Sequence, residues 1–230
     1  MNRDLFHFYK ELNHLTNVTE DNYFDINLNM INNATKIKIL ETAIDLFSQK
    51  GYSGVSIRDI IKEVKIKESS VYKHFKNKNE ILETIFINFR KEVAKICPPV
   101  NSLKSILSNL STKEFLEKGL SQFMNHIDNP IMRKIWRIIY IEQFRDSLAR
   151  EIYLKDIIHT TIDFLEEAFI IMQAKQQIPP MDPRTLAIEY QYPIFTMITE
   201  YILLKFDNIE TIEVERKMYN HIEFFCKAIL

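Results

Sequence analysis

A cluster of short polar and charged side chains lies in the first half of the chain. Ser69, Ser70 and Lys73 are spaced so that a short helix would present hydroxyl and ammonium groups on one side. Val71 and Phe75 would fall on the other side and hold that helix against a small core. Such outward groups can donate hydrogen bonds to the base edges and phosphates of duplex DNA when the helix enters the major groove. On periodicity alone, an ordinary helical hairpin with a solvated face explains the pattern equally well.

The elements that must position this cluster are four helices with clear boundaries. An apolar stripe with the helical period ends at Gly51, where a left-handed glycine is expected to stop the first helix. Ser56, followed by Asp59 three residues later, predicts a capping box at the start of the second helix. A four-residue break precedes the short third helix, and Asn77 is placed to cap the fourth. Two short helices joined by a tight turn and braced by another are the parts of a helix-turn-helix unit.

The rest of the chain also follows the helical period, and no segment has the two-residue alternation or the turn residues of a β-hairpin. The sequence therefore predicts an all-α protein, with an N-terminal three-helix helix-turn-helix domain and a C-terminal helical bundle. Pro98 and Pro99 end the fourth helix and mark the expected domain boundary. Further helices are expected near residues 112–127, 130–144, 147–176, 183–206 and 211–229. The expected domains are an N-terminal extension over 1–33 that could be flexible, a DNA-binding domain over 34–91, and an effector-binding and dimerisation domain over 92–230.

Composition narrows the function classes. Of the 230 residues, 46% are hydrophobic and 27% charged, which is typical of a soluble globular protein. The formal charge is −1, yet residues 34–91 carry twelve basic and seven acidic side chains, a net charge of +5 that indicates a local contact with a polyanion. The three glycines are too scattered for a phosphate-binding loop, and no catalytic motif is present. We therefore predict no enzymatic activity, no metal and no cofactor.

The two cysteines and the apolar segments indicate the compartment. Cys97 and Cys226 lie far apart and form no C-x-x-C motif, which favours a reducing environment. The N-terminus lacks the apolar core of a signal peptide, and the longest apolar stretch falls short of the about 18 uninterrupted residues that a membrane span needs. The sequence therefore predicts a cytoplasmic protein that does not enter a membrane.

Four segments resemble the tetracycline-repressor (TetR) family of transcriptional regulators: residues 39–47, Gly51-Tyr52, residues 55–60 and residues 71–78. The resemblance covers residues 36–82 and includes the pattern Tyr-x-His-Phe-x-x-Lys after a capped helix. It implies a DNA-reading helix from about residue 68 to residue 74, with hydroxyl and ammonium groups nearest the base edges and flanking groups on the phosphates. The DNA contacts that it implies are Ser56, Lys67, Glu68, Ser69, Ser70, Tyr72, Lys73, His74 and Lys78.

The chain departs from the family pattern at the turn of this unit. Lys65 stands where the family usually has glycine, and Lys67 stands where it usually has serine or threonine as a helix cap. Loss of that cap is expected to cost on the order of 1 kcal/mol. Both lysines could offset this cost as phosphate contacts. Glu68 could repel a phosphate or accept a hydrogen bond from a cytosine amino group.

The resemblance implies a homodimer in which the last two long helices, near 183–206 and 211–229, form the interface. It also implies a ligand pocket in the larger domain, and the aromatic character of the central helices suggests a small hydrophobic effector. Plain core packing is the more common role of such an aromatic stripe. The candidate ligand-binding residues are Phe123, Trp136, Tyr140, Phe144, Phe164, Phe169 and Met172.

Two further groups of charged residues admit more than one interpretation. His159, Asp163 and Glu166 have helical spacing that could hold a divalent metal, although an exposed ion-paired face is the stronger interpretation. Glu142 and Arg145 could be a buried pair that orients a ligand, or simply a surface pair.

The resulting hypothesis is a repressor that a small hydrophobic effector releases from a palindromic DNA operator. The alternative is a DNA-binding protein of the same fold that is controlled by a protein partner or acts in chromosome organisation. An enzyme or structural bundle that merely resembles this unit would lack a basic face around Lys67, Lys73 and Lys78. Met30 could serve as an alternative start, which would make the extension before it dispensable.

Overall fold

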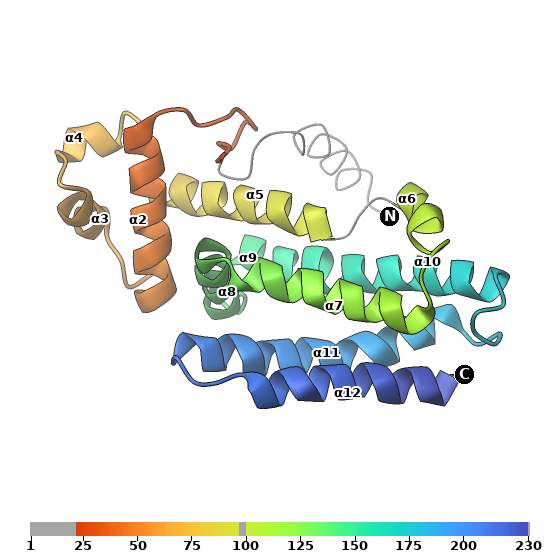
Figure 1. Cartoon of the computed structure of the whole chain (residues 1–230). Coiled ribbons are helices and arrows are strands. Elements are labelled where there is room, and N and C mark those ends of the chain that lie inside the picture. The colour runs from red at the N-terminus through yellow and green to blue at the C-terminus, as the bar shows by residue number, and fades with distance from the viewer. Residues whose placement is uncertain (1–21, 97–99, 230) are drawn as a thin grey trace. The chain divides into compact units, whose positions relative to one another are not determined.

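The computed structural model describes residues 22–96 and 100–229, and its regular structure there is helical (Figure 1). One isolated antiparallel bridge joins Phe24 and Met30. The chain divides into two compact units. Among the described residues, unit 1 comprises residues 22–95 and 129–154, and unit 2 comprises residues 96, 100–128 and 155–229. The all-α prediction is confirmed, whereas the domain ranges 34–91 and 92–230 stay predictions. Residues 129–154 lie with the N-terminal helices rather than with the rest of the C-terminal part.

Unit 1 begins with four helices whose boundaries follow local rules. Asn33 caps α2 by accepting a hydrogen bond from the Lys36 amide at 3.0 Å, and Gly51 ends α2 with a φ of 72°. Asn77 accepts from the amide of Glu80 at 2.9 Å and so caps the fourth of these helices, as predicted. The helices of this unit are α2 (Ala34–Lys50), α3 (Ile57–Val64), α4 (Glu68–Val71), α5 (Lys78–Ile96), α8 (Pro130–Glu142) and α9 (Ser147–Glu151).

The core of unit 1 joins α8 to the N-terminal helices. Trp136 of α8 is almost fully buried, and its ring meets that of Phe89 on α5 edge-on, with 5.0 Å between centroids. Helix α8 also packs along α2, where Lys134 forms an ion pair with Asp45. Contacts between segments so far apart in sequence make α8 part of the same folded unit as the helix-turn-helix elements.

Residues 22–33, here called the N-terminal strap, contact α5 through Asn22 and Phe24. Phe24 is buried, its backbone N–H donates to Asn88 Oδ1, and Asn88 Nδ2 donates back to the Phe24 carbonyl, both at 2.8 Å. The ammonium group of Lys91 donates to the carbonyl of Asn22 at 2.8 Å and lies 4.7 Å from the centre of the Phe24 ring. This part of the N-terminal extension, for which the sequence allowed flexibility, is held in place. The Phe24 side chain fills an apolar site, and the Phe24 backbone satisfies the buried amide of Asn88. The first 21 residues lie outside the described part.

Unit 2 is a bundle in which α10 packs on α11, α11 on α12, and α12 on α7 (Figure 1). Asp182 caps α11, and Pro183 occupies its first turn, where a missing N–H costs nothing. Pro193 lies inside α11 and removes one internal hydrogen bond. The helices of this unit are α6 (Val100–Ile106), α7 (Thr112–Asp128), α10 (Thr160–Ala174), α11 (Pro183–Phe206) and α12 (Ile212–Ile229). Within the described ranges, none of the helices is both long enough and apolar enough to cross a lipid bilayer.

The single helix predicted over 147–176 is wrong in its details. The structure has α9, then a π-helix, η1 (Ile152–His159), and then α10. The hydroxyl group of Thr160 donates to the carbonyl of Lys155, five residues earlier, at 2.9 Å. A π-helix joins residues five positions apart and occurs as a short segment within longer helices, so an apolar period read over the whole segment does not reveal it.

Candidate nucleic-acid interface

Helix α3, the second helix of the helix-turn-helix domain, begins with the predicted capping box. Ser56 accepts a hydrogen bond from the amide of Asp59 at 3.2 Å, and Asp59 Oδ2 accepts from the Ser56 amide at 2.7 Å. The hydrogen bond from the Ser56 side chain, followed by the one from its backbone, lowers the pKa of the Asp59 carboxyl. The prediction for the start of α3 is confirmed, and the exposed Ser56 stands at its N-terminal end.

The turn between α3 and α4 contains a left-handed residue that is not glycine. Lys65 has a φ of 62° and a ψ of 45°, the left-handed conformation that glycine adopts without cost, and its amide donates to the Ile61 carbonyl at 2.8 Å. A residue with a Cβ pays about 1–2 kcal/mol for this conformation. Lys67 occupies the N-cap position of α4 without any side-chain hydrogen bond to the helix. The turn therefore keeps a left-handed residue at Lys65, and α4 begins without a side-chain cap at Lys67.

The expected reading helix is shorter than predicted. Regular α-helix spans only Glu68–Val71, and the chain continues in turns to Phe75, where the amides of His74 and Phe75 both donate to the Val71 carbonyl at 2.9 Å. Val71 and Phe75 are buried, which confirms the predicted inward face. The residues that remain exposed are Lys67, Glu68, Ser69, Tyr72 and Lys73, while Ser70 and His74 are half-buried.

Lys78 has internal partners that the sequence did not suggest. Its Nζ donates to the carbonyls of Tyr52 at 2.9 Å and Val55 at 2.8 Å, and it lies 4.0 Å from the centre of the Tyr52 ring. Burial lowers the pKa of this ammonium group, and the negative charge of Glu142 offsets part of the change. Because an ammonium group has three N–H donors, one remains beyond these two carbonyls. The contact of Lys78 with a phosphate stays a prediction.

Glu142 is a residue whose place the sequence did not reveal. It ends α8, is 1% exposed, and accepts a hydrogen bond from the backbone N–H of Tyr52 at 2.8 Å. Arg145 is exposed, so the two side chains form no buried pair. The only sequence signal was an acidic residue at the end of a strongly apolar helix, which does not identify a partner 90 residues away.

The predicted ligand-binding residues are distributed over both units. In unit 1, Trp136 and Tyr140 pack against each other with 6.1 Å between ring centroids, whereas Phe144 is 84% exposed. In unit 2, Phe169 and Met172 are fully buried, and the Phe169 ring packs on Phe225. The two remaining candidates, Phe123 and Phe164, are half-buried in unit 2. This burial is typical of core packing, and a ligand contact by any of the seven stays a prediction.

The charged face of α10 is ion-paired. Arg184 of α11 pairs with Asp163, and it donates to Glu166 Oε2 at 2.7 Å. These hydrogen bonds raise the pKa of the Arg184 guanidinium group. The ion-paired interpretation of Asp163 and Glu166 is therefore confirmed. Within the described ranges, no three histidine, cysteine, aspartate or glutamate side chains are grouped so that they could hold a metal ion.

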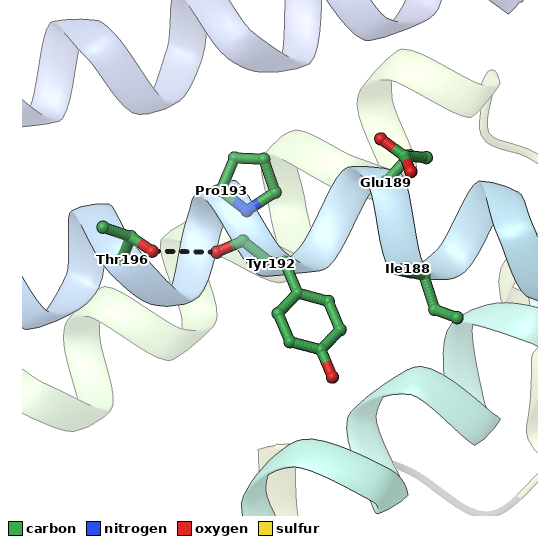
Figure 2. Close-up of a pocket in the computed structure, with 5 residues that line it drawn as sticks. All are labelled: Ile188, Glu189, Tyr192, Pro193 and Thr196. Atoms are coloured by element: carbon green, nitrogen blue, oxygen red, sulfur yellow. Dashed lines mark hydrogen bonds between the residues drawn. The ribbon is translucent and has the colours of Figure 1, made fainter.

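A surface pocket of about 620 Å³ lies on α11 around Pro193. Figure 2 shows Ile188 and Tyr192 projecting from one side of the helix, with Glu189 and Pro193 on the other. Thr196 completes the lining, and its hydroxyl group donates to the Tyr192 carbonyl at 3.2 Å. Tyr192 is half exposed, so this part of α11 presents an apolar and aromatic surface.

Comparisons with known proteins identify relatives of the N-terminal part. Residues 39–85 match the family model described as bacterial regulatory proteins, tetR family. The chain is 33% identical over 120 residues to the probable HTH-type transcriptional regulator YttP of Bacillus subtilis, a match that covers 52% of this chain and 56% of YttP. It is 54% identical over 46 residues to IcaR of Staphylococcus epidermidis, the biofilm operon icaADBC HTH-type negative transcriptional regulator. That match covers 20% of this chain and 25% of IcaR, so the chain spans about half of one relative and a quarter of the other.

A solved structure extends the similarity of fold to most of the chain. The SmeT–triclosan complex superimposes with a TM-score of 0.61 at 17% sequence identity, covering 86% of this chain and 92% of that one. At this level of identity the match supports the fold alone.

Proposed function

We propose that this chain, which belongs to the TetR family of bacterial regulatory proteins, is a homodimeric transcriptional repressor that binds a palindromic operator. A small hydrophobic effector would release the repressor from that operator. The observation that carries the proposal is the exposed face of residues 67–73 on a short helix whose back is anchored by Val71 and Phe75. The protein would act on DNA in the cytoplasm.

The proposed DNA contacts follow from exposure and charge. Ser69 and Lys73 would approach base edges, because both are exposed on the side of the short helix away from Val71. Lys67 and Tyr72, exposed at its two ends, would contact phosphates. Phosphate contacts add affinity that falls with salt, whereas base contacts add specificity. Ser56, Glu68, Ser70, His74 and Lys78 complete the proposed interface.

Helices α11 and α12 supply the proposed dimer interface. They expose Tyr192, Leu203, Tyr219 and Phe224, the last of them to 71%. A second copy that packed against α11 and α12 would remove these apolar side chains from water. A two-fold dimer would place two reading helices in successive major grooves, about 34 Å apart.

The relatives support repression and an effector. IcaR is named a negative regulator, and SmeT was solved as a complex with triclosan. Both observations concern those proteins, and they motivate the same roles here. The second candidate, a DNA-binding protein without a small-molecule effector, is favoured by the full burial of Trp136, Phe169 and Met172.

DNA binding is tested with a duplex that the unmodified chain selects from a randomised library. Lys73→Ala should weaken binding about tenfold or more, since a good base contact is worth about 1–3 kcal/mol. Lys118→Ala removes the same charge from an exposed site in unit 2 and serves as the matched control. Equal affinity of the unmodified chain and Lys73→Ala for the selected duplex would refute the role of this helix.

Dimer formation is tested by sedimentation velocity. Phe224→Lys should shift the sedimenting species from dimer to monomer, because a charge would replace an apolar contact in the proposed interface. Leu154→Lys alters an exposed apolar residue of unit 1 and should leave the dimer intact. A Phe224→Lys chain that sediments as the unmodified one does would exclude this interface.

A further inference from the structure

The buried carboxylate of Glu142 has no place among the proposed DNA contacts. It closes α8, and its Oε1 lies 2.8 Å from the backbone nitrogen of Tyr52, 90 residues earlier in the chain. Burial of a carboxylate is strongly unfavourable unless opposite charge and hydrogen bonds compensate for the lost water. The position of the Glu142 carboxylate therefore depends on the Tyr52 N–H and the Lys78 ammonium group, which also belong to unit 1.

Those groups hold the loop of residues 51–55 from two sides. Glu142 accepts the N–H of Tyr52, while the ammonium group of Lys78 donates to the C=O groups of Tyr52 and Val55. Both backbone polar groups of Tyr52 are thereby fixed, and the carboxylate and the ammonium group interact favourably across the loop. The ring of Tyr52 packs edge-on against Phe47, with 5.4 Å between centroids.

Gly51 shows how closely α8 approaches this loop. A Cβ added at Gly51 would lie 3.3 Å from Glu142 Oε1 and 3.5 Å from Ile141 Cγ2, and the φ of 72° also disfavours any other residue. Glycine at this position thus allows the carboxylate to reach the next amide. The contact belongs to the helix-turn-helix unit itself, since the loop leads directly to Ser56 at the start of α3.

We infer that Glu142 is a positioning residue for DNA binding: by holding the Tyr52 amide it fixes the 51–55 loop, and with it the placement of Ser56 and Lys78 at the phosphate backbone. The inference rests on the proposed function and deepens it, because it assigns α8 control over two phosphate contacts without any contact of α8 with DNA. The carboxylate acts through its hydrogen-bond acceptor. An amide in its place retains that acceptor and loses the charge.

Three variants separate this role from simple stabilisation. In Glu142→Ala the acceptor is removed, in Glu142→Gln it is kept, and Lys134→Gln removes the exposed ion pair between α8 and α2 as a control. Anisotropy titrations with the selected duplex should show at least about tenfold weaker binding for Glu142→Ala. The slope of log affinity against log salt should fall by about 0.9 for each phosphate that the variant no longer neutralises. Glu142→Gln and Lys134→Gln should stay within about threefold of the unmodified chain.

Amide hydrogen exchange provides a readout that does not need DNA. The Tyr52 amide should exchange faster in Glu142→Ala and at the unmodified rate in Glu142→Gln. If Glu142→Ala does not fold, Glu142→Asp replaces it, because the shorter side chain withdraws the acceptor by one methylene group.

The outcomes decide between the alternatives. Unchanged affinity and salt slope in Glu142→Ala would overturn the inference. The same holds if that variant merely has a smaller active fraction in stoichiometric titration, with the dissociation constant and the slope unaltered. If the unmodified chain enriches no duplex from the library, the proposed function itself fails.

Discussion

Removal of residues 22–29 of the N-terminal strap should strongly destabilise unit 1. This segment buries the Phe24 side chain, which is worth about 2 kcal/mol. It also makes two buried hydrogen bonds with the Asn88 amide, each worth about 1 kcal/mol net. A chain that starts at Met30 should therefore be about 4 kcal/mol less stable than one that starts at Asn22, a large part of the 5–15 kcal/mol typical of a whole domain.

The assay uses the single tryptophan of the chain as a probe of this unit. Trp136 is buried against Phe89, the neighbour of Asn88 on α5, so its fluorescence during urea unfolding should report the loss of this core. The comparison of chains starting at residues 22 and 30 isolates the segment 22–29, since both lack the first 21 residues.

Asn88→Ala provides the internal control. In the chain that retains the strap it should cost about 3 kcal/mol, because the backbone N–H and C=O of Phe24 would be left buried without partners. In the chain that starts at Met30 it should cost less than about 1 kcal/mol, since those partners are gone. An equal cost of Asn88→Ala in both chains would refute the reasoning.

Further predictions concern the turn and the helix caps. Lys65→Gly should raise the free energy of unfolding by about 0.5–1 kcal/mol, because the relief of left-handed strain exceeds the entropic cost of glycine; urea titration that shows destabilisation would contradict this. Lys67→Thr should add about 1 kcal/mol by capping α4, yet weaken binding to the selected duplex, and a variant that gains both would exclude a DNA contact by Lys67. The hydrogen bonds from Thr185 lower the pKa of Asp182, so the stability that this carboxylate contributes is complete above the ordinary pKa of aspartate and is lost as the pH falls through the lowered value. Thermal unfolding from about pH 6 to about pH 3 should show the difference between Asp182→Ala and the unmodified chain shrinking, and a difference independent of pH would speak against the cap.

The sequence alone determined the features that depend on neighbours along the chain. The helical period predicted an all-α protein, and the spacing of Ser56 and Asp59 predicted a capping box that the structure confirms. The stop at Gly51 and the burial of Val71 and Phe75 were likewise foreseen. Helix caps and helix faces involve residues at most a few positions apart, so residue type and spacing are sufficient to recognise them.

Tertiary structure decided which distant groups meet. The pairing of Glu142 with Tyr52, the reciprocal hydrogen bonds of Asn88 with Phe24, and the ion pair of Arg184 with Asp163 join residues separated by 90, 64 and 21 positions. Each partner is an ordinary polar residue when viewed in its own segment, and only packing brings it to its complement. A buried carboxylate or amide must find a partner, but its own sequence neighbourhood does not encode which partner that will be, because the choice depends on how helices that lie far apart in the chain fit together.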